Sequence, residues 1–263
     1  MKRKFIMSCL KLTVLERIIV GSILAALCIL ADSIDLVPLL FRDNISVDVH
    51  YFWFNSITYG GIYGKYFINI LAALPFSCDF CEEYSNGIWR YVLGRMKISE
   101  YIRAKFISCF LISGFTVAAG GGLFILMAGL KSPLLLESRQ IEIQFLPYSE
   151  QLINKSALYF VLMLYLLFLS GGLWACIAYT LSVYFPFKYF VYISPFIGIF
   201  LLARGFNIFH IPGNLRLDYW LCGREVPIEG KRGILIITSV VLSICIMCSL
   251  LCIKKLKWRI QHE

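Results

Sequence analysis

A glycine-rich stretch that contains a lysine is the segment whose residue types come nearest to nucleotide chemistry. It reads Tyr59-Gly60-Gly61-Ile62-Tyr63-Gly64-Lys65-Tyr66. A phosphate-binding loop holds phosphates with backbone N–H groups and a lysine, and the following Ser or Thr reaches the magnesium ion. Here the glycine spacing is one residue short and a tyrosine follows the lysine. The sequence therefore predicts no nucleotide site, and no ATP hydrolysis, within this chain.

The ten cysteines are the next residues that could do chemistry. Cys78-x-x-Cys81 and Cys245-x-x-Cys248 have the spacing of zinc or redox pairs. The first pair ends one apolar run and the second lies inside another, so the two pairs are not expected to meet. We expect these thiols to pack as small apolar groups, and we predict neither a metal site nor catalytic residues.

Asp32 and Asp35 are the only carboxylates that fall near the middle of an apolar run. Asp32 lies about 25 Å along a helix that begins near Leu15, close to the far surface of a hydrocarbon core of about 30 Å. Two interpretations stay open. The pair either marks the end of the helix in the interface or lines a path through the membrane.

The amino-acid composition indicates the class of protein to which these residues belong. Apolar and aromatic residues make up 59% of the 263 residues and charged residues only 16%, with a mean hydropathy of +0.77. A soluble domain carries about 25% charged residues, so the chain is predicted to be a membrane protein. The net charge of +9 is expected to reflect basic cytoplasmic loops, not nucleic-acid binding, because no basic stripe with interleaved aromatics stands outside the apolar runs.

The hydropathy pattern predicts an all-α, polytopic membrane protein with six transmembrane helices, formed by one domain over 1–263. Each run is too long for a barrel strand and lacks period-two alternation. The basic, apolar-interleaved start at 1–17 predicts a helix lying in the membrane interface before the first span. Apolar character returns at 206–213, which predicts a re-entrant segment or an aromatic interfacial loop before the sixth helix. The expected spans are 15–36, 62–80, 106–130, 157–185, 187–202 (interrupted by Pro195) and 233–253.

Glycines cluster inside two of these spans, at Gly120-Gly121-Gly122 and at Gly171-Gly172. Small residues let membrane helices approach closely. We therefore expect these positions to mark tight helix contacts within the chain.

The distribution of Lys and Arg predicts the orientation. With the N-terminus inside, the cytoplasmic segments 1–17, 81–105, 186–188 and 254–263 carry 15 basic residues, and the opposite segments carry 9. The positive-inside rule then places both termini in the cytoplasm of a multi-pass protein of the cytoplasmic membrane.

The segment 79–105 is the most informative cytoplasmic stretch. Its charges are mixed, and Ile88, Trp89, Val92, Leu93 and Met96 recur at helical spacing. This pattern predicts a short amphipathic helix, broken near Asn86-Gly87 and Gly94. An ordinary connecting loop with a solvated charged face is the alternative.

This segment resembles the cytoplasmic loop of type-2 ATP-binding-cassette (ABC) exporter permeases, most closely those of Gram-positive bacteria, some of which are linked to peptide or bacteriocin self-protection. Glu83, the turn glycine Gly87, Val92-Leu93, Ser99 and Lys105 stand at matching spacing. Ile88 replaces the usual Thr after the glycine, and Met96 replaces a common Pro. The resemblance covers about 25 residues, while six spans and inside termini agree with the family along the chain.

The resemblance implies a permease subunit that works with separate cassette ATPase subunits, which bind ATP and magnesium, and with a second permease, identical or related. The loop would form a coupling helix that seats on the ATPase. Glu82, Glu83 and Arg90 would be charges at its rim, Gly87 its turn, and Ile88, Trp89, Val92 and Leu93 its docking or bilayer-facing side chains. The few charges in the spans favour an amphipathic or apolar cargo, either a peptide or a lipid-like molecule. An ion-coupled secondary transporter and a non-transporting sensor or structural subunit remain as alternatives.

Overall fold

The computed structural model describes residues 12–41, 47–136, 147–228 and 230–262, and this part of the chain is helical with connecting turns. Five helices are long and apolar enough to cross a membrane: α2 (Leu12–Asp32), α7 (Ile98–Gly129), α10 (Ser156–Tyr184), α11 (Lys188–Ile208) and α13 (Lys231–His262). The prediction of an all-helical membrane protein with several spans is confirmed by these five helices. The predicted interfacial helix at 1–17 falls largely outside the described residues.

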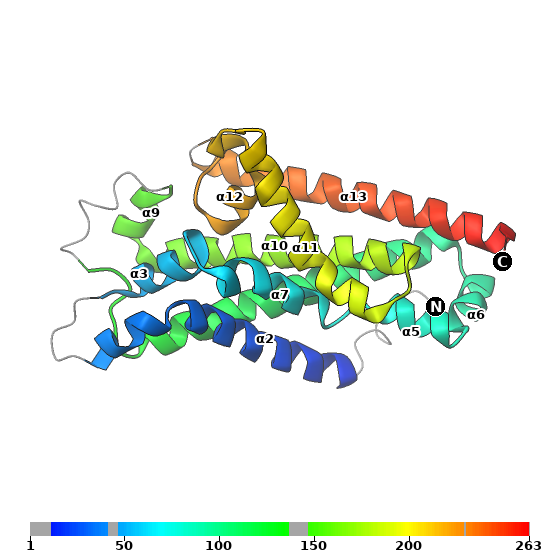
Figure 1. Cartoon of the computed structure of the whole chain (residues 1–263), viewed down its shortest axis with the longest axis horizontal. Helices are drawn as coiled ribbons and strands as arrows, with labels where there is room; N and C mark the ends of the chain where they lie inside the picture. The colour runs from blue at the N-terminus through cyan, green and yellow to red at the C-terminus, as the bar shows by residue number, and fades with distance from the viewer. Residues whose placement is uncertain (1–11, 42–46, 137–146, 229, 263) are drawn as a thin grey trace.

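Shorter helices fill the connections between the long ones. They are η1 (Ile34–Phe41), α3 (Val49–Trp53), η2 (Phe54–Thr58), η3 (Tyr63–Phe67), α4 (Ile68–Ala73), α5 (Asp79–Ser85), α6 (Ile88–Arg95), α9 (Ser149–Asn154), η5 (Gly213–Leu215) and α12 (Leu217–Cys222). In Figure 1, α5, α6 and the C-terminal turns of α13 lie at one end of the bundle, here called the α6 end. The region of α3, α9 and α12 lies toward the opposite end, here called the α12 end.

The prediction of one continuous helix over 62–80 is wrong. The chain here forms the π-helix η3 and the single α-helix α4, and it then turns through residues 74–78 before α5 begins. Pro75 supplies no backbone donor, which explains why the helix stops there. Because α4 packs against α2, α7, α10 and α11, the interrupted backbone is covered by protein, the condition under which such a break is tolerated inside a membrane. Figure 1 shows these short helices following one another along the bundle.

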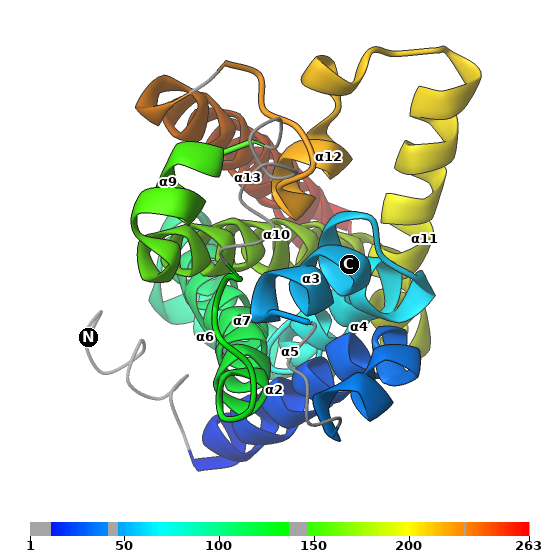
Figure 2. The ribbon, with the colours of Figure 1, turned by 90° about the vertical axis from the view of Figure 1, so that its left-hand side faces the viewer.

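The α7–α10 pair forms the centre of the bundle, with α2 against α7 and α13 against α10 (Figure 2). Glycines lie at the contacts. A Cβ on Gly120 would lie 2.5 Å from the Cβ of Ala25, and one on Gly172 would lie 2.7 Å from the ring of Phe110. The prediction that these glycines mark tight helix contacts is confirmed for Gly120, Gly121, Gly171 and Gly172, whereas a Cβ on Gly122 would meet its nearest atom only at 3.9 Å.

The helix that corresponds to the predicted fifth span extends beyond its predicted end. α11 runs without a break through Pro195 and Arg204 to Ile208, and the chain turns at His210, which has a φ of 51°. Residues 206–208 therefore continue α11 and do not begin a separate half-helix. The short helix α12 follows and packs against α10, burying Asp218 and Trp220.

Candidate functional site

The segment singled out by sequence folds as a helical hairpin, here called the α5–α6 hairpin (Asp79–Arg95). α5 ends at Ser85, and Gly87 then takes a left-handed conformation with a φ of 67° before α6 begins at Ile88. A Cβ at Gly87 would meet no atom within 4 Å, so the glycine is required by the backbone conformation and not by crowding. Met96 is extended and ends α6, and α7 starts at Ile98. The predicted break at Asn86-Gly87 is confirmed, whereas Gly94 lies within α6.

A buried lysine joins this hairpin to the bundle. Lys105 of α7 is only 1% exposed, and its ammonium group forms ion pairs with Asp79 and, at 2.7 Å, with Glu83. Asp79 and Glu83 are four residues apart on α5, so their side chains share one face. The hydroxyl of Tyr101 donates a hydrogen bond to the second oxygen of Glu83. An ammonium this well removed from water needs such partners, because the cost of desolvating it is several kcal/mol.

This geometry corrects the prediction for Glu83. The carboxylate is not a charge at the rim of a docking helix, because both of its oxygens are bound inside the chain, one by Lys105 and the other by Tyr101. Its side chain is 17% exposed. The matching spacing of Glu83 and Lys105 in the sequence therefore corresponds to a direct contact that fixes α5 on α7.

Glu82 faces a different way. Its carboxylate forms an ion pair with Lys188 of α11 at 3.2 Å and another with Arg17 of α2 at 3.7 Å. All three side chains are more than a third exposed, so each pair is weak. Glu82 thus lies near the surface and links α5 to the two helices beside it, and its role as a rim charge of a docking helix stays a prediction.

Aromatic rings hold α6 from its inner side. Trp89 is 3% exposed and stacks on Tyr84 of α5 with ring centroids 6.0 Å apart. The guanidinium of Arg259, from the last turns of α13, lies 4.8 Å from the Tyr84 ring, and that of Arg90 lies 5.4 Å from the Trp89 ring. Trp89 is therefore part of the internal packing and is not a docking or bilayer-facing side chain. Val92 and Leu93 also pack against this core.

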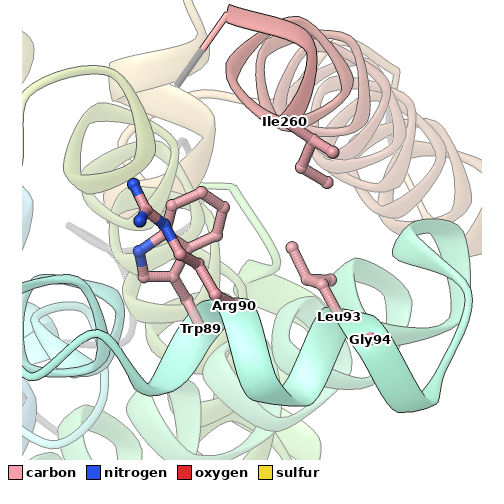
Figure 3. A pocket seen from close by; sticks show the side chains of 5 residues that line it. All are labelled: Trp89, Arg90, Leu93, Gly94 and Ile260. Carbon is pink, nitrogen blue, oxygen red and sulfur yellow. The ribbon is translucent and has the colours of Figure 1, made fainter.

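A pocket of about 340 Å³ opens between α6 and the end of α13. Trp89, Arg90, Leu93, Gly94 and Ile260 line it, and Figure 3 shows Leu93 and Ile260 pointing toward one another across it. Its lining combines apolar side chains with polar groups, among them the Arg90 guanidinium.

The outer side of α6 is formed by residues that are exposed in the described part of the chain. Ile88 is 46% exposed and Tyr91 76% exposed, and Arg95 one turn later is also exposed. Of the four predicted apolar docking residues, Ile88 alone lies on this side. Tyr91 was missed by the sequence analysis, although its position three residues after Ile88 could have placed it on the same face.

Comparison with family models, curated proteins and solved structures finds no match.

Asp32, one of the two proposed pathway carboxylates, has a local structural partner. It ends α2 and accepts hydrogen bonds from the backbone N–H groups of Tyr63 and Gly64 at the start of η3. Gly61 and Gly64 lie so close to this carboxylate that a Cβ on either would crowd it. The glycine-rich stretch therefore binds an anion that the chain supplies itself. Asp35, in η1, is exposed.

The cysteine pairs do not form a metal site in the described part of the chain, which contains no group of three or more His, Cys, Asp or Glu placed to hold a metal ion. Cys78 and Cys81 are both buried beside α11. A hydrogen bond from the Cys78 thiol lowers the pKa of Cys81, and the nearby charge of Lys188 acts in the same direction. This pair helps pack α5 against its neighbours.

Proposed function

We propose that this chain is the permease subunit of an ATP-driven exporter of the ABC type, with the α5–α6 hairpin as the element that receives a separate ATPase subunit. The observation that supports this best is the buried Lys105–Asp79–Glu83 contact, which fastens an otherwise protruding hairpin to a long helix of the bundle. A connector that served only to join two helices would not need a buried ion cluster at its base.

The exposed side of α6 would supply the docking surface. Ile88, Tyr91 and Arg95 are spaced three and four residues apart and lie on one face. A large aromatic anchor beside an aliphatic side chain, with an arginine at the edge, is a composition enriched at the centre of protein interfaces. ATP and magnesium would bind to the partner.

The contacts of the hairpin give a route for motion. A displacement of α6 would be passed to α7 through the short Met96-Lys97 connection and through Lys105, and to α13 through Arg259 and Ile260. Glu82 extends the contacts to α2 and α11. Closure of the ATPase subunits would then move several long helices together.

The cargo is proposed to be amphipathic or apolar, either a peptide or a lipid-like molecule. The most apolar windows of the five long helices contain at most two charged residues each. A path lined by such helices offers few partners for a strongly charged solute. A second permease, identical or related, would complete that path.

Co-purification with a co-expressed cassette ATPase tests the proposal. Tyr91→Ala is expected to lower recovery of the complex about tenfold or more, in the range of an interface hot spot, without changing the thermal stability of the permease alone. Ser85→Ala, an exposed position on α5, is the matched control and should leave recovery unchanged. A parent chain that associates with no such ATPase would refute the proposal.

A second candidate, an ion-coupled secondary transporter, draws support from the same buried cluster, because ionisable groups inside a membrane protein often carry protons or ions. The position of Lys105 argues against it. The lysine lies about 10 Å along α7 from Ile98, near the α6 end and not at the midplane, where coupling sites are usual. Transport driven by a proton gradient in liposomes that lack any ATPase would favour this candidate. A non-transporting sensor or structural subunit would show neither activity.

A further inference from the structure

Three cations gather around one tyrosine ring at the α12 end. The Arg216 guanidinium lies 3.9 Å from the centroid of Tyr219, that of Arg224 lies 4.4 Å away, and the Lys65 ammonium lies 5.4 Å away. They come from separate elements, since Lys65 belongs to η3 while Arg216 and Arg224 flank α12. Arg216 is paired with Asp218, which leaves Lys65 and Arg224 as two like charges at one ring, an arrangement that favours an anion near them.

Two of the carboxylates nearby are held by other groups, and a third lies against a glycine. Asp218 is buried and accepts two hydrogen bonds from Arg216, at 3.2 and 2.9 Å, so this pair is locally neutral. Asp32 is bound by the amides of Tyr63 and Gly64, and Glu225 lies against Gly213. Among the described residues, no ion pair joins Lys65, Arg204 or Arg224 to a carboxylate.

A row of aromatic rings leads away from these cations along α11. Lys65 lies over Tyr66, which contacts Phe196 and Phe200, and the Arg204 guanidinium lies 5.4 Å from the Phe200 ring. Phe196 and Phe200 stack with an interplanar angle of 11°, and Phe67 packs on Phe196. From Arg204 to Phe196 the row covers about 12 Å of helix. Phe200 and Phe67 are 41% and 38% exposed, so the row is open to the bilayer.

We propose that Lys65 and Arg224, which share the Tyr219 ring, bind the phosphate of an anionic phospholipid, with an acyl chain along Phe67, Phe196 and Phe200. A cationic head next to an exposed apolar row matches the two halves of such a lipid, and juxtamembrane Lys and Arg side chains attract anionic headgroups. A free phosphate would use the cations but leave the aromatic row uncovered. The site is independent of the exporter proposal, because it lies at the end of the bundle opposite the α5–α6 hairpin.

Native mass spectrometry of the full chain, purified in detergent, tests this site. The chain is incubated with phosphatidylglycerol or with phosphatidylcholine of the same acyl chains, and the retained lipid is counted. We expect selective retention of phosphatidylglycerol. The double variant Lys65→Gln/Arg224→Gln should lower that retention about tenfold, on the basis of roughly 1 kcal/mol for each cation.

Two control variants separate charge recognition from loss of fold. Lys155→Gln removes an exposed cation just before α10 and should retain phosphatidylglycerol as the parent does. Lys65→Arg keeps the charge and should do the same. Equal retention of the two lipids by the parent, or undiminished retention by the double variant, would overturn the proposal. Displacement of the lipid by millimolar inorganic phosphate alone would show a simple anion site and would also overturn it.

Discussion

Lys105 of α7 and Glu83 of α5 meet at 2.7 Å inside the protein, although 22 residues separate them in the chain. The hydrogen bond from Tyr101 to the same carboxylate restricts its orientation further. The base of the α5–α6 hairpin is thus held by charge, while its tip is held by the stacking of Trp89 on Tyr84. Substitutions in the ion cluster at the base and substitutions at the tip of the hairpin should therefore have different effects on stability.

Loss of the Glu83 charge is expected to destabilise the fold. Glu83→Gln removes one of the carboxylates paired with the buried ammonium of Lys105, and breaking a buried pair costs about 3–5 kcal/mol. The midpoint of thermal unfolding in detergent should fall clearly. Glu82→Gln, at the neighbouring but half-exposed position, is the matched control and should cost less than about 1 kcal/mol. Equal effects of the two variants would contradict the assignment of Glu83 to the interior.

Substitution of Gly87 is expected to strain the hairpin turn. A β-branched residue resists a φ of 67°, so Gly87→Val should cost about 1–2 kcal/mol, while Gly87→Asn should cost less, because asparagine tolerates this region. Gly94→Val is the control, since a Cβ there also meets open space and the glycine has no positive φ. Thermal unfolding of the three variants gives the comparison. A loss at Gly94 as large as that at Gly87 would show that the turn conformation is not the cause.

The sequence predicted the long helices well because hydropathy depends on local composition alone. It failed over 62–80, where Pro75 interrupts a run that is otherwise mostly apolar. The sequence also could not show which of Glu82 and Glu83 faces the interior of the protein. Adjacent carboxylates on a helix point about 100° apart, and which of them faces inward is decided by Lys105, whose place next to α5 depends on how the helices pack. The turn at Gly87 was predictable because asparagine-glycine pairs mark turns wherever they occur.

Gly120 is expected to tolerate no side chain at the α2–α7 contact. A Cβ there would lie 2.5 Å from the Cβ of Ala25 and 2.8 Å from the carbonyl oxygen of Ser22, so Gly120→Ala should cost about 1–3 kcal/mol by overpacking. Gly122→Ala is the control two residues later, where the nearest atom is a Leu164 methyl at 3.9 Å. It should be neutral or stabilising by up to about 1 kcal/mol, because alanine favours helix over glycine. Thermal unfolding of both variants in the same detergent decides between packing and propensity.

The predicted orientation can be tested with single introduced cysteines at exposed positions on opposite ends of the bundle. Asn154→Cys lies just before α10 and Ser85→Cys lies at the end of α5. If both termini are cytoplasmic, an impermeant maleimide added to intact cells should label the first variant and label the second only after the cells are opened. The parent chain gives the background from its own cysteines. The reverse pattern would place the α5–α6 hairpin outside the cell, where no cassette ATPase could reach it.

Asp32 and Gly61 form a pair whose coupling can be measured. The Asp32 carboxylate accepts the backbone N–H groups of Tyr63 and Gly64, and a methyl group on Gly61 would overlap that carboxylate. Asp32→Ala should cost about 1–2 kcal/mol through loss of this cap, and Gly61→Ala a similar amount through the clash.

The double variant should cost less than the sum of the two single variants, because removing the carboxylate makes room for the methyl group. A coupling energy of at least about 0.5 kcal/mol is expected for residues in contact. Asp35→Ala is the control, since Asp35 is exposed in η1 and should show no measurable coupling energy with Gly61. Additive effects at Asp32 and Gly61 would mean that the carboxylate does not occupy the glycine-rich turn. The interpretation of Asp32 as a group that lines the transport path would then be favoured.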